Sequence, residues 1–89
     1  MKKTIENINR VLVDWNPIEV PEDVAKEEYK GYIPVILQSI ENHQQLLDCV
    51  VDILINSMGL DYNPMKREHL ADVQAVCDRI LKAYKEATQ

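Results

Sequence analysis

Hydrophobic positions near the start of the chain recur at the spacing of one face of an α-helix. The repeat runs at intervals of three, four and three residues through Ile5, Ile8, Leu12 and Trp15. Residues at this spacing lie above one another on a helix, so the segment should bury one apolar stripe. Thr4 can cap the helix, and Pro17 disfavours helical geometry at Asn16. We therefore expect a first helix that ends at Trp15 or Asn16.

A second helical segment is expected to begin at Pro21, because proline suits a first turn and two acidic residues follow it. Its expected inward positions are Val24, Tyr29, Tyr32 and Ile33. The segment either runs from about Pro21 to Asn42 with a kink, or breaks near Gly31 and restarts with Pro34 in its first turn. The helical spacing of apolar residues continues through Pro34, which favours the kinked version.

The third helical segment carries the widest apolar surface of the chain. Asn42 and Gln45 resemble a capping pair at its start. Its apolar residues are Leu46, Leu47, Val50, Val51, Ile53, Leu54, Ile55 and Met58. At ~100° per residue they cover roughly 200° of arc, so we expect this helix to be central, with neighbours on two sides. Gly59 followed by Leu60 is typical of a helix end.

A last helix is expected after Asn63-Pro64, which would act as its cap and first residue. Its stripe consists of Leu70, Val73, Val76, Cys77, Ile80, Leu81 and Tyr84. The chain shows no strand pattern, no internal repeat and no long linker. We predict an all-α fold, a single helical domain over residues 1–89. Short connections favour a small antiparallel bundle of about four helices.

The balance of charges narrows the choice of partners. Fifteen Asp and Glu residues against ten Lys and Arg give a net charge of −5, and no basic run is longer than Lys66-Arg67. Phosphate backbones and anionic membranes attract positive patches, so the sequence disfavours nucleic acid and membranes and favours a basic protein partner. We expect neither a signal peptide nor a membrane-spanning stretch, and predict a cytoplasmic protein.

Residue groups that carry catalysis or hold metals are not recognisable in the sequence. His43 and His69 are 26 residues apart without partners at ligand spacing, and Cys49 and Cys77 form no CxxC motif. Two glycines cannot build a phosphate-binding loop. We therefore assign no catalytic, cofactor-binding or metal-binding residue, expect no cofactor, and find no support for an enzyme.

The corner after the first helix holds the only Trp of the chain, Trp15, followed by Asn16 and Pro17. We interpret Trp15 as a packing joint whose ring covers one end of the core and reaches the tyrosines. Aromatic rings at helical spacing in so small a core are usually core residues. The alternative is a ligand or interaction site formed by Trp15, Asn16, Tyr29 and Tyr32.

Three short motifs resemble the signatures of a family of short bacterial proteins of unknown function. They are WNPIEV at 15–20, EEYKGYIP at 27–34 and SMGL at 57–60. They are similar to W-[DN]-P-[IL], [DE]-E-Y-x-x-Y-[IV]-P and M-G-L, although Asn16 stands where that family commonly has Asp. Lys30-Gly31 likewise stand where an acidic residue and Ser are common. The resemblance spans roughly residues 8 to 84 and implies an all-helical bacterial cytosolic domain without catalytic assignments.

These observations lead to three functional hypotheses. The leading hypothesis is a non-catalytic protein-interaction or regulatory module that offers its surface to another protein or to a second copy, as a homodimer. The first alternative is a small-ligand binder or minor enzyme with a pocket at Trp15, Tyr29 and Tyr32. The second is an acidic immunity protein that masks a basic toxin, for which binding should weaken steeply with salt.

Overall fold

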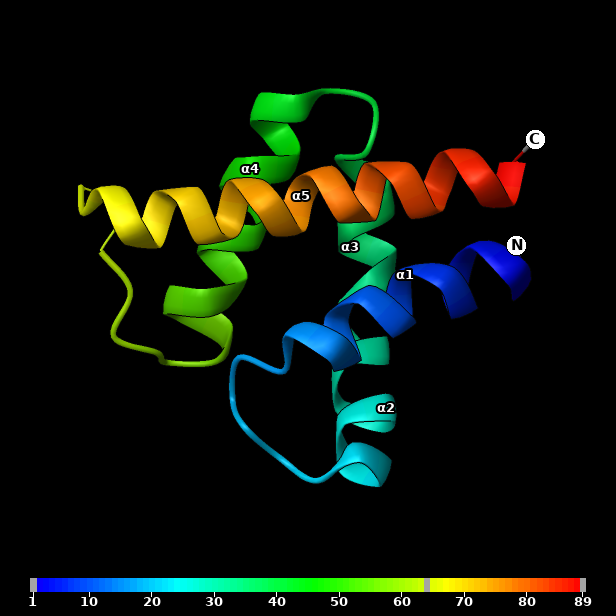
Figure 1. Cartoon of the computed structure of the whole chain (residues 1–89), viewed down its shortest axis with the longest axis horizontal. Coiled ribbons are helices and arrows are strands. Elements are labelled where there is room, and N and C mark those ends of the chain that lie inside the picture. The colour runs from blue at the N-terminus through cyan, green and yellow to red at the C-terminus, as the bar shows by residue number, and fades with distance from the viewer. Residues whose placement is uncertain (1, 64, 89) are drawn as a thin grey trace.

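The computed structural model describes residues 2–63 and 65–88, and all regular structure in these residues is helical. The prediction of an all-α fold is confirmed. The elements in chain order are α1 (Lys2–Trp15), α2 (Glu22–Lys30), α3 (Ile33–Gln38), α4 (His43–Asp52), the π-helical turn η1 (Ile53–Ser57) and α5 (Arg67–Thr88), shown in Figure 1. Five α-helices are therefore present in the described residues, against the four or so expected, because the second segment is divided.

The main helix pair of the bundle joins the two ends of the chain. Helices α1 and α5 run antiparallel and bring both termini to the same side of the molecule, while α3 and α4 cross them (Figure 1). Helix α1 contacts α2, α3 and α5, whereas α4 contacts α3, η1 and α5. The expected small bundle is present, and α4 has neighbours on two sides, α3 and α5, as predicted for the third segment, while α1 contacts three helices.

The core is formed by the inward stripes of all the helices. Its buried apolar residues are Ile8, Val11, Leu12, Ala25, Tyr29, Ile33, Ile36, Ile40, Leu46, Leu47, Val50, Ile53, Leu54, Val73, Val76, Cys77 and Ile80. Most of them belong to the stripes that the spacing predicts. In α2, however, Ala25 is fully buried and Val24 is 46% exposed, contrary to the prediction for Val24. The small side chain of Ala25 suits the place where α2 packs against α1.

The second helical segment breaks near Gly31. The favoured prediction of a kinked helix from Pro21 to Asn42 is therefore wrong, and the alternative, a break followed by a new helix with Pro34 in its first turn, is correct. Helix α2 ends at Lys30, and Gly31 and Tyr32 form a turn in which the Tyr32 N–H donates to the Tyr29 carbonyl at 3.1 Å. Helix α3 then carries Pro34 in its first turn and ends at Gln38. Pro34 has no N–H to continue the α-helical ladder, which explains the break.

The third segment begins as predicted and ends in an unexpected way. The Asn42 side chain accepts the Gln45 N–H at 3.0 Å, which confirms the cap. After Asp52 the ladder widens into η1, where the Met58 N–H donates to the Ile53 carbonyl at 2.8 Å. A π turn holds an extra residue, so later side chains are rotated around the axis. Predicted inward Ile55 is consequently 37% exposed.

Gly59 ends this segment in the predicted manner. Its backbone has φ +66°, the left-handed conformation that glycine adopts at a helix end. The Leu60 N–H folds back to the Leu54 carbonyl at 2.9 Å, and Leu60 packs against the core. Glycine therefore stops the helix and turns the chain toward α5.

Helices α1 and α5 begin at residues other than those predicted. Helix α1 includes Lys2, so Thr4 lies inside its first turn, where it is buried, and does not cap it. Helix α5 begins at Arg67, and Pro64, its predicted first residue, lies outside the described residues. Asn63 caps a turn instead, because its side chain accepts the Met65 N–H at 2.9 Å.

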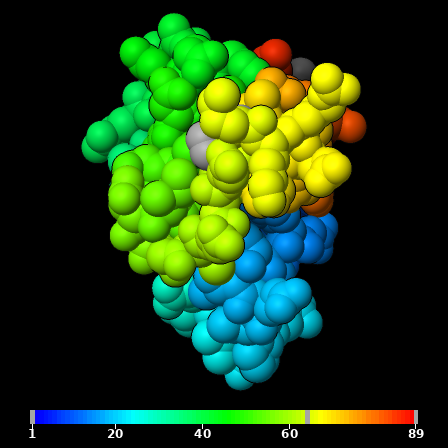
Figure 2. Space-filling view, turned by 90° about the vertical axis from the view of Figure 1, so that its left-hand side faces the viewer, coloured from blue at the N-terminus to red at the C-terminus, as the bar shows by residue number. Residues whose placement is uncertain are grey.

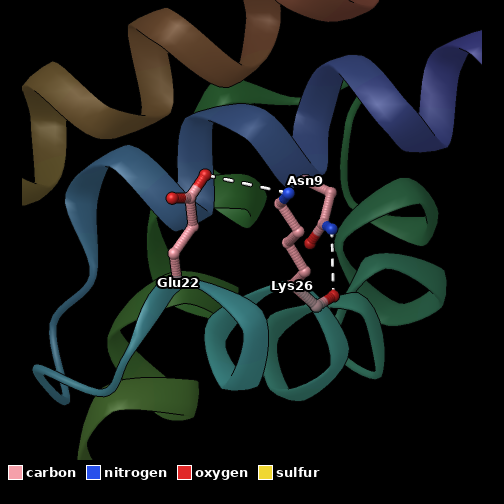
Figure 3. A network of polar contacts seen from close by, with 3 residues as sticks. All are labelled: Asn9, Glu22 and Lys26. Carbon is pink, nitrogen blue, oxygen red and sulfur yellow. Dashed lines mark hydrogen bonds and ion pairs between the residues drawn. The ribbon is translucent and has the colours of Figure 1, made fainter.

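A side-chain hydrogen bond also joins α1 to α2 (Figure 3). The Asn9 amide nitrogen donates to the Lys26 carbonyl at 3.0 Å, and the Lys26 ammonium lies 3.7 Å from the Glu22 carboxylate. The Asn9 bond joins the two helices, whereas the ion pair lies within α2. Within residues 2–63 and 65–88, no helix is both long and apolar enough to span a membrane.

Candidate functional site

The side chain of Asn16 closes the corner after α1. Asn16 has a left-handed backbone with φ 46°, which asparagine tolerates better than most residues. Its amide nitrogen donates to the Val20 carbonyl at 2.9 Å, and its amide oxygen accepts the Val20 N–H at 3.2 Å. An aspartate here would keep the acceptor and lose the donor. The asparagine amide thus holds both backbone groups of Val20.

The phenol of Tyr29 ties α2 to the same corner. The side chain is 0% exposed, its hydroxyl donates to Asn16 Oδ1 at 2.8 Å, and it accepts the Ile18 N–H at 3.1 Å. Burial raises the pKa of the Tyr29 phenol above its ordinary value, and the hydrogen bond from Ile18 opposes part of this shift. Tyr29 is therefore a protonated, buried joint between α2 and the loop after α1.

The space between the rings of Trp15, Tyr29 and Tyr32 is small. The cavity among them has a volume of about 10 Å³ and is otherwise lined by Leu12, Ile36, Val50, Ile53 and Met58. That volume suffices for about one water molecule, whereas drug-sized ligands need roughly 300 Å³ or more. The structure thus brings the predicted corner residues together through packing and through the bond between Tyr29 and Asn16.

Trp15 also lines a much larger, open cleft of about 670 Å³. Figure 2 faces this end of the molecule, where the segment after α1, the loop after η1 and the first turns of α5 meet. We call it the acidic cleft and define it by Trp15, Asn16, Pro17, Glu19, Leu54, Leu60, Asp61, Tyr62, Glu68, His69 and Asp72.

Carboxylates dominate the charge of the acidic cleft. Glu19, Asp61, Glu68 and Asp72 line it together with His69, and no Lys or Arg of the described residues does. The described part of the chain holds no group of three His, Cys, Asp or Glu residues that could bind a metal. The carboxylates therefore surround the cleft without converging on one ion. Charges of one sign around a hollow produce a potential that attracts groups of the opposite sign, here cations.

Aromatic rings on two sides of the cleft are held by hydrogen bonds. The Trp15 indole N–H donates to Asp72 Oδ2 at 3.3 Å, which ties the ring to α5. The rings of Tyr62 and His69 stack with centroids 5.4 Å apart and an interplanar angle of 25°. The Tyr62 hydroxyl donates to the His69 carbonyl at 3.2 Å, and the Asn63 N–H donates to His69 Nδ1 at 3.0 Å. This last bond assigns the proton of the neutral imidazole to Nε2.

Glu19 stands at the cleft in an unusual backbone conformation. Its φ is 53°, in the left-handed region that glycine adopts readily and glutamate rarely. The Glu19 N–H donates to the Asn16 carbonyl at 3.0 Å, which closes the turn. Residues held in such conformations are concentrated at functional sites, where the surrounding structure maintains them.

Neither cysteine offers a nucleophile. Burial raises the pKa of the Cys77 thiol to about 12, and burial also raises the pKa of the partly buried Cys49 thiol. The reactive form of cysteine is the thiolate, so both side chains are unreactive at neutral pH. Both are free thiols.

Residues predicted from the sequence form one wall of the acidic cleft, whereas the residues of the other wall were not predicted. Of the predicted corner residues, Trp15 and Asn16 line the cleft, whereas Tyr29 and Tyr32 lie outside its lining. The acidic groups of the loop after η1 and of α5 were not assigned to any site. Their one sequence signal is that Glu68 and Asp72 lie one helical turn apart, and only the packing of α1 on α5 places them beside Trp15.

Comparisons with known proteins give no assignment. No protein-family model matches the chain, and no curated protein or solved structure matches it. The resemblance to a bacterial family of unknown function stays a prediction.

Proposed function

We propose that the protein is a non-catalytic interaction module that binds a basic partner protein in the acidic cleft. The observation that carries this proposal is the cleft lining, in which carboxylates and the rings of Trp15 and Tyr62 occur without lysine or arginine among the described residues. A lysine or arginine side chain of the partner would be neutralised by the carboxylates, while its stem or guanidinium lies against an aromatic face.

The whole-chain charge supports the same partner chemistry. A net charge of −5 attracts a basic protein from a distance, and the cleft then provides the specific contact. A basic toxin masked by this protein is a second candidate partner, favoured by the same charge. We place the interaction in the cytoplasm, because two free thiols fit a reducing compartment.

The cleft supports binding better than catalysis. Asp72 accepts the Trp15 indole N–H, and His69 Nδ1 accepts a backbone N–H, so both groups hold the walls of the cleft. The two thiols are kept protonated by burial. We therefore assign the cleft residues to recognition.

The single Trp provides a direct assay. Because Trp15 lines the cleft, a short arginine- and lysine-containing peptide should change its fluorescence on binding. Asp61→Asn and Glu68→Gln remove cleft charges that take part in no ion pair of the described residues. Each should weaken binding about two- to fivefold, the range of exposed charge pairs, and about 0.5 M salt should abolish most of it.

A matched control separates the cleft from the net charge. Glu41 is exposed and outside the cleft, so Glu41→Gln makes the same charge change and should leave the affinity unaltered. Equal weakening by Glu41→Gln and Glu68→Gln would show that the peptide responds only to overall charge, against the proposal. Light scattering of the purified protein tells whether a second copy is the partner.

A further inference from the structure

A basic groove runs between the two longest helices and shares no lining residue with the acidic cleft. We define the basic groove by Asn7, Arg10 and Val11 of α1 and by Arg79, Lys82, Ala83 and Glu86 of α5; its volume is about 290 Å³. Within each helix the lining residues recur at intervals of three or four, with Arg10 and Val11, and Lys82 and Ala83, adjacent in sequence, so each set lies on one helical face. The groove is thus a regular feature of the packing between α1 and α5.

An ion pair fixes how the two faces align. Arg79 Nη2 lies 3.2 Å from Asp14 Oδ2, which joins the helices near the end of α1. Because α1 and α5 are antiparallel (Figure 1), one turn back along α1 corresponds to one turn forward along α5. That step leads from Asp14 to Arg10 and from Arg79 to Lys82.

The antiparallel packing of α1 and α5 therefore places two cations, Arg10 and Lys82, opposite each other across the groove. Neither Arg10 nor Lys82 forms an ion pair with another described residue, whereas the preceding turn holds a matched acid and base. Like charges at facing positions repel one another. An anion between them would replace this repulsion by two attractions.

The floor of the groove leaves room for such an anion. Val11 is buried and Ala83 is partly buried, whereas Arg10 and Lys82 are exposed, so the apolar residues form the floor and the small side chain of Ala83 fills little of the space. The Asn7 amide can donate a hydrogen bond, and Glu86, the one carboxylate among the described lining residues, disfavours an anion near its own end. Because Arg79 is already paired with Asp14, a ligand is expected between Arg10 and Lys82.

We propose that the basic groove binds a small dianionic phosphate group, free or as a monoester. Arginine and lysine form strong charge-assisted hydrogen bonds to phosphate oxygens, and a dianion can bridge one cation from each helix. This site is independent of the acidic cleft, which selects cations. Binding would join α1 to α5 and so stabilise the main helix pair of the fold.

NMR titration of the isotope-labelled protein tests the site. Inorganic phosphate, compared with chloride at equal ionic strength, should shift the backbone amides of residues 7–11 and 79–86 along saturating curves. Arg10→Gln and Lys82→Gln should each weaken binding about tenfold, because each removes a charge-assisted contact. Glu86→Gln should tighten binding. Glycerol 1-phosphate in a second titration shows whether a monoester binds more tightly than the free ion.

Two further variants make the result decisive. Ala83→Leu fills the floor without changing charge, and it should weaken binding while circular dichroism shows an intact fold, because Ala83 is only partly buried. Lys66→Gln removes an exposed cation outside the groove and should bind phosphate like the unchanged protein. The site is refuted if neither phosphate probe binds, if Ala83→Leu binds normally, or if Lys66→Gln weakens binding as much as Lys82→Gln.

Discussion

Replacing Tyr29 by phenylalanine should destabilise the protein by about 2 kcal/mol. The ring stays in its buried place, and only the hydroxyl that joins α2 to the corner after α1 is lost. Asn16 Oδ1 keeps the Val20 N–H as a donor, but the Ile18 N–H loses its partner. A lost hydrogen bond costs about 1 kcal/mol and an unsatisfied donor about 1 to 3 kcal/mol, with the lower part of that range expected because Ile18 is only partly buried.

Urea denaturation followed by circular dichroism and Trp15 fluorescence measures this change. A loss of about 2 kcal/mol lowers the melting temperature of a domain this size by roughly 8 to 16 °C. Tyr84→Phe is the matched control, since the Tyr84 hydroxyl makes no hydrogen bond to a described residue, and its effect should stay within about 0.5 kcal/mol. If Tyr29→Phe were as stable as Tyr84→Phe, the Tyr29 hydroxyl would not stabilise the corner, and the prediction would be wrong.

Two other predictions concern the backbone and the core. Gly31→Ala should stabilise the protein by about 0.5 kcal/mol, because φ there is −63° and an added Cβ would meet only the Glu28 carbonyl at 3.6 Å. Gly59→Ala should destabilise it by about 1 kcal/mol, because φ is +66°; thermal shifts of the same sign for both variants would contradict this reasoning. The pKa of Cys77 is about 12 in the folded state against 9.0 for a free thiol. Burial of the protonated thiol therefore contributes its full share to the free energy of unfolding below pH 9, and this contribution is lost as the pH rises from 9 to 12. Over that range one thiol lowers the unfolding free energy by about 1.4 kcal/mol per pH unit, and Cys77→Ala should show a shallower decline in urea titrations; an unchanged slope would disprove it.

The helix ends show which structural features can be predicted from residues within one helical turn. The capping bond of Asn42 and the left-handed Gly59 depend on residues within one turn, so the sequence predicts both correctly. At Pro34 two local rules compete, since apolar spacing continues while the missing N–H interrupts the ladder. The structure follows the missing hydrogen bond. The π turn has no sequence signal of this kind, and it alters which side chains of the third segment reach the core.

The candidate sites depend on contacts between distant parts of the chain. Trp15 meets Asp72, and Arg79 meets Asp14, only because α1 packs against α5 from the other end of the sequence. Charges in one helix can be placed on a face from spacing alone, but their partners across a groove cannot. The acidic cleft and the basic groove therefore lie beyond what periodicity predicts.

By itself, the sequence determined the helical class, most inward stripes and most of the helix stops, because hydrophobic period, caps, proline and glycine act within a few residues. The tertiary structure alone decided that the first and last helices form the main pair, because helix order in space depends on the complementarity of whole faces. That pairing also decided which charges meet. The electrostatic potential at a site is the sum over charged groups from separate elements, so the sequence pattern of one element does not predict it.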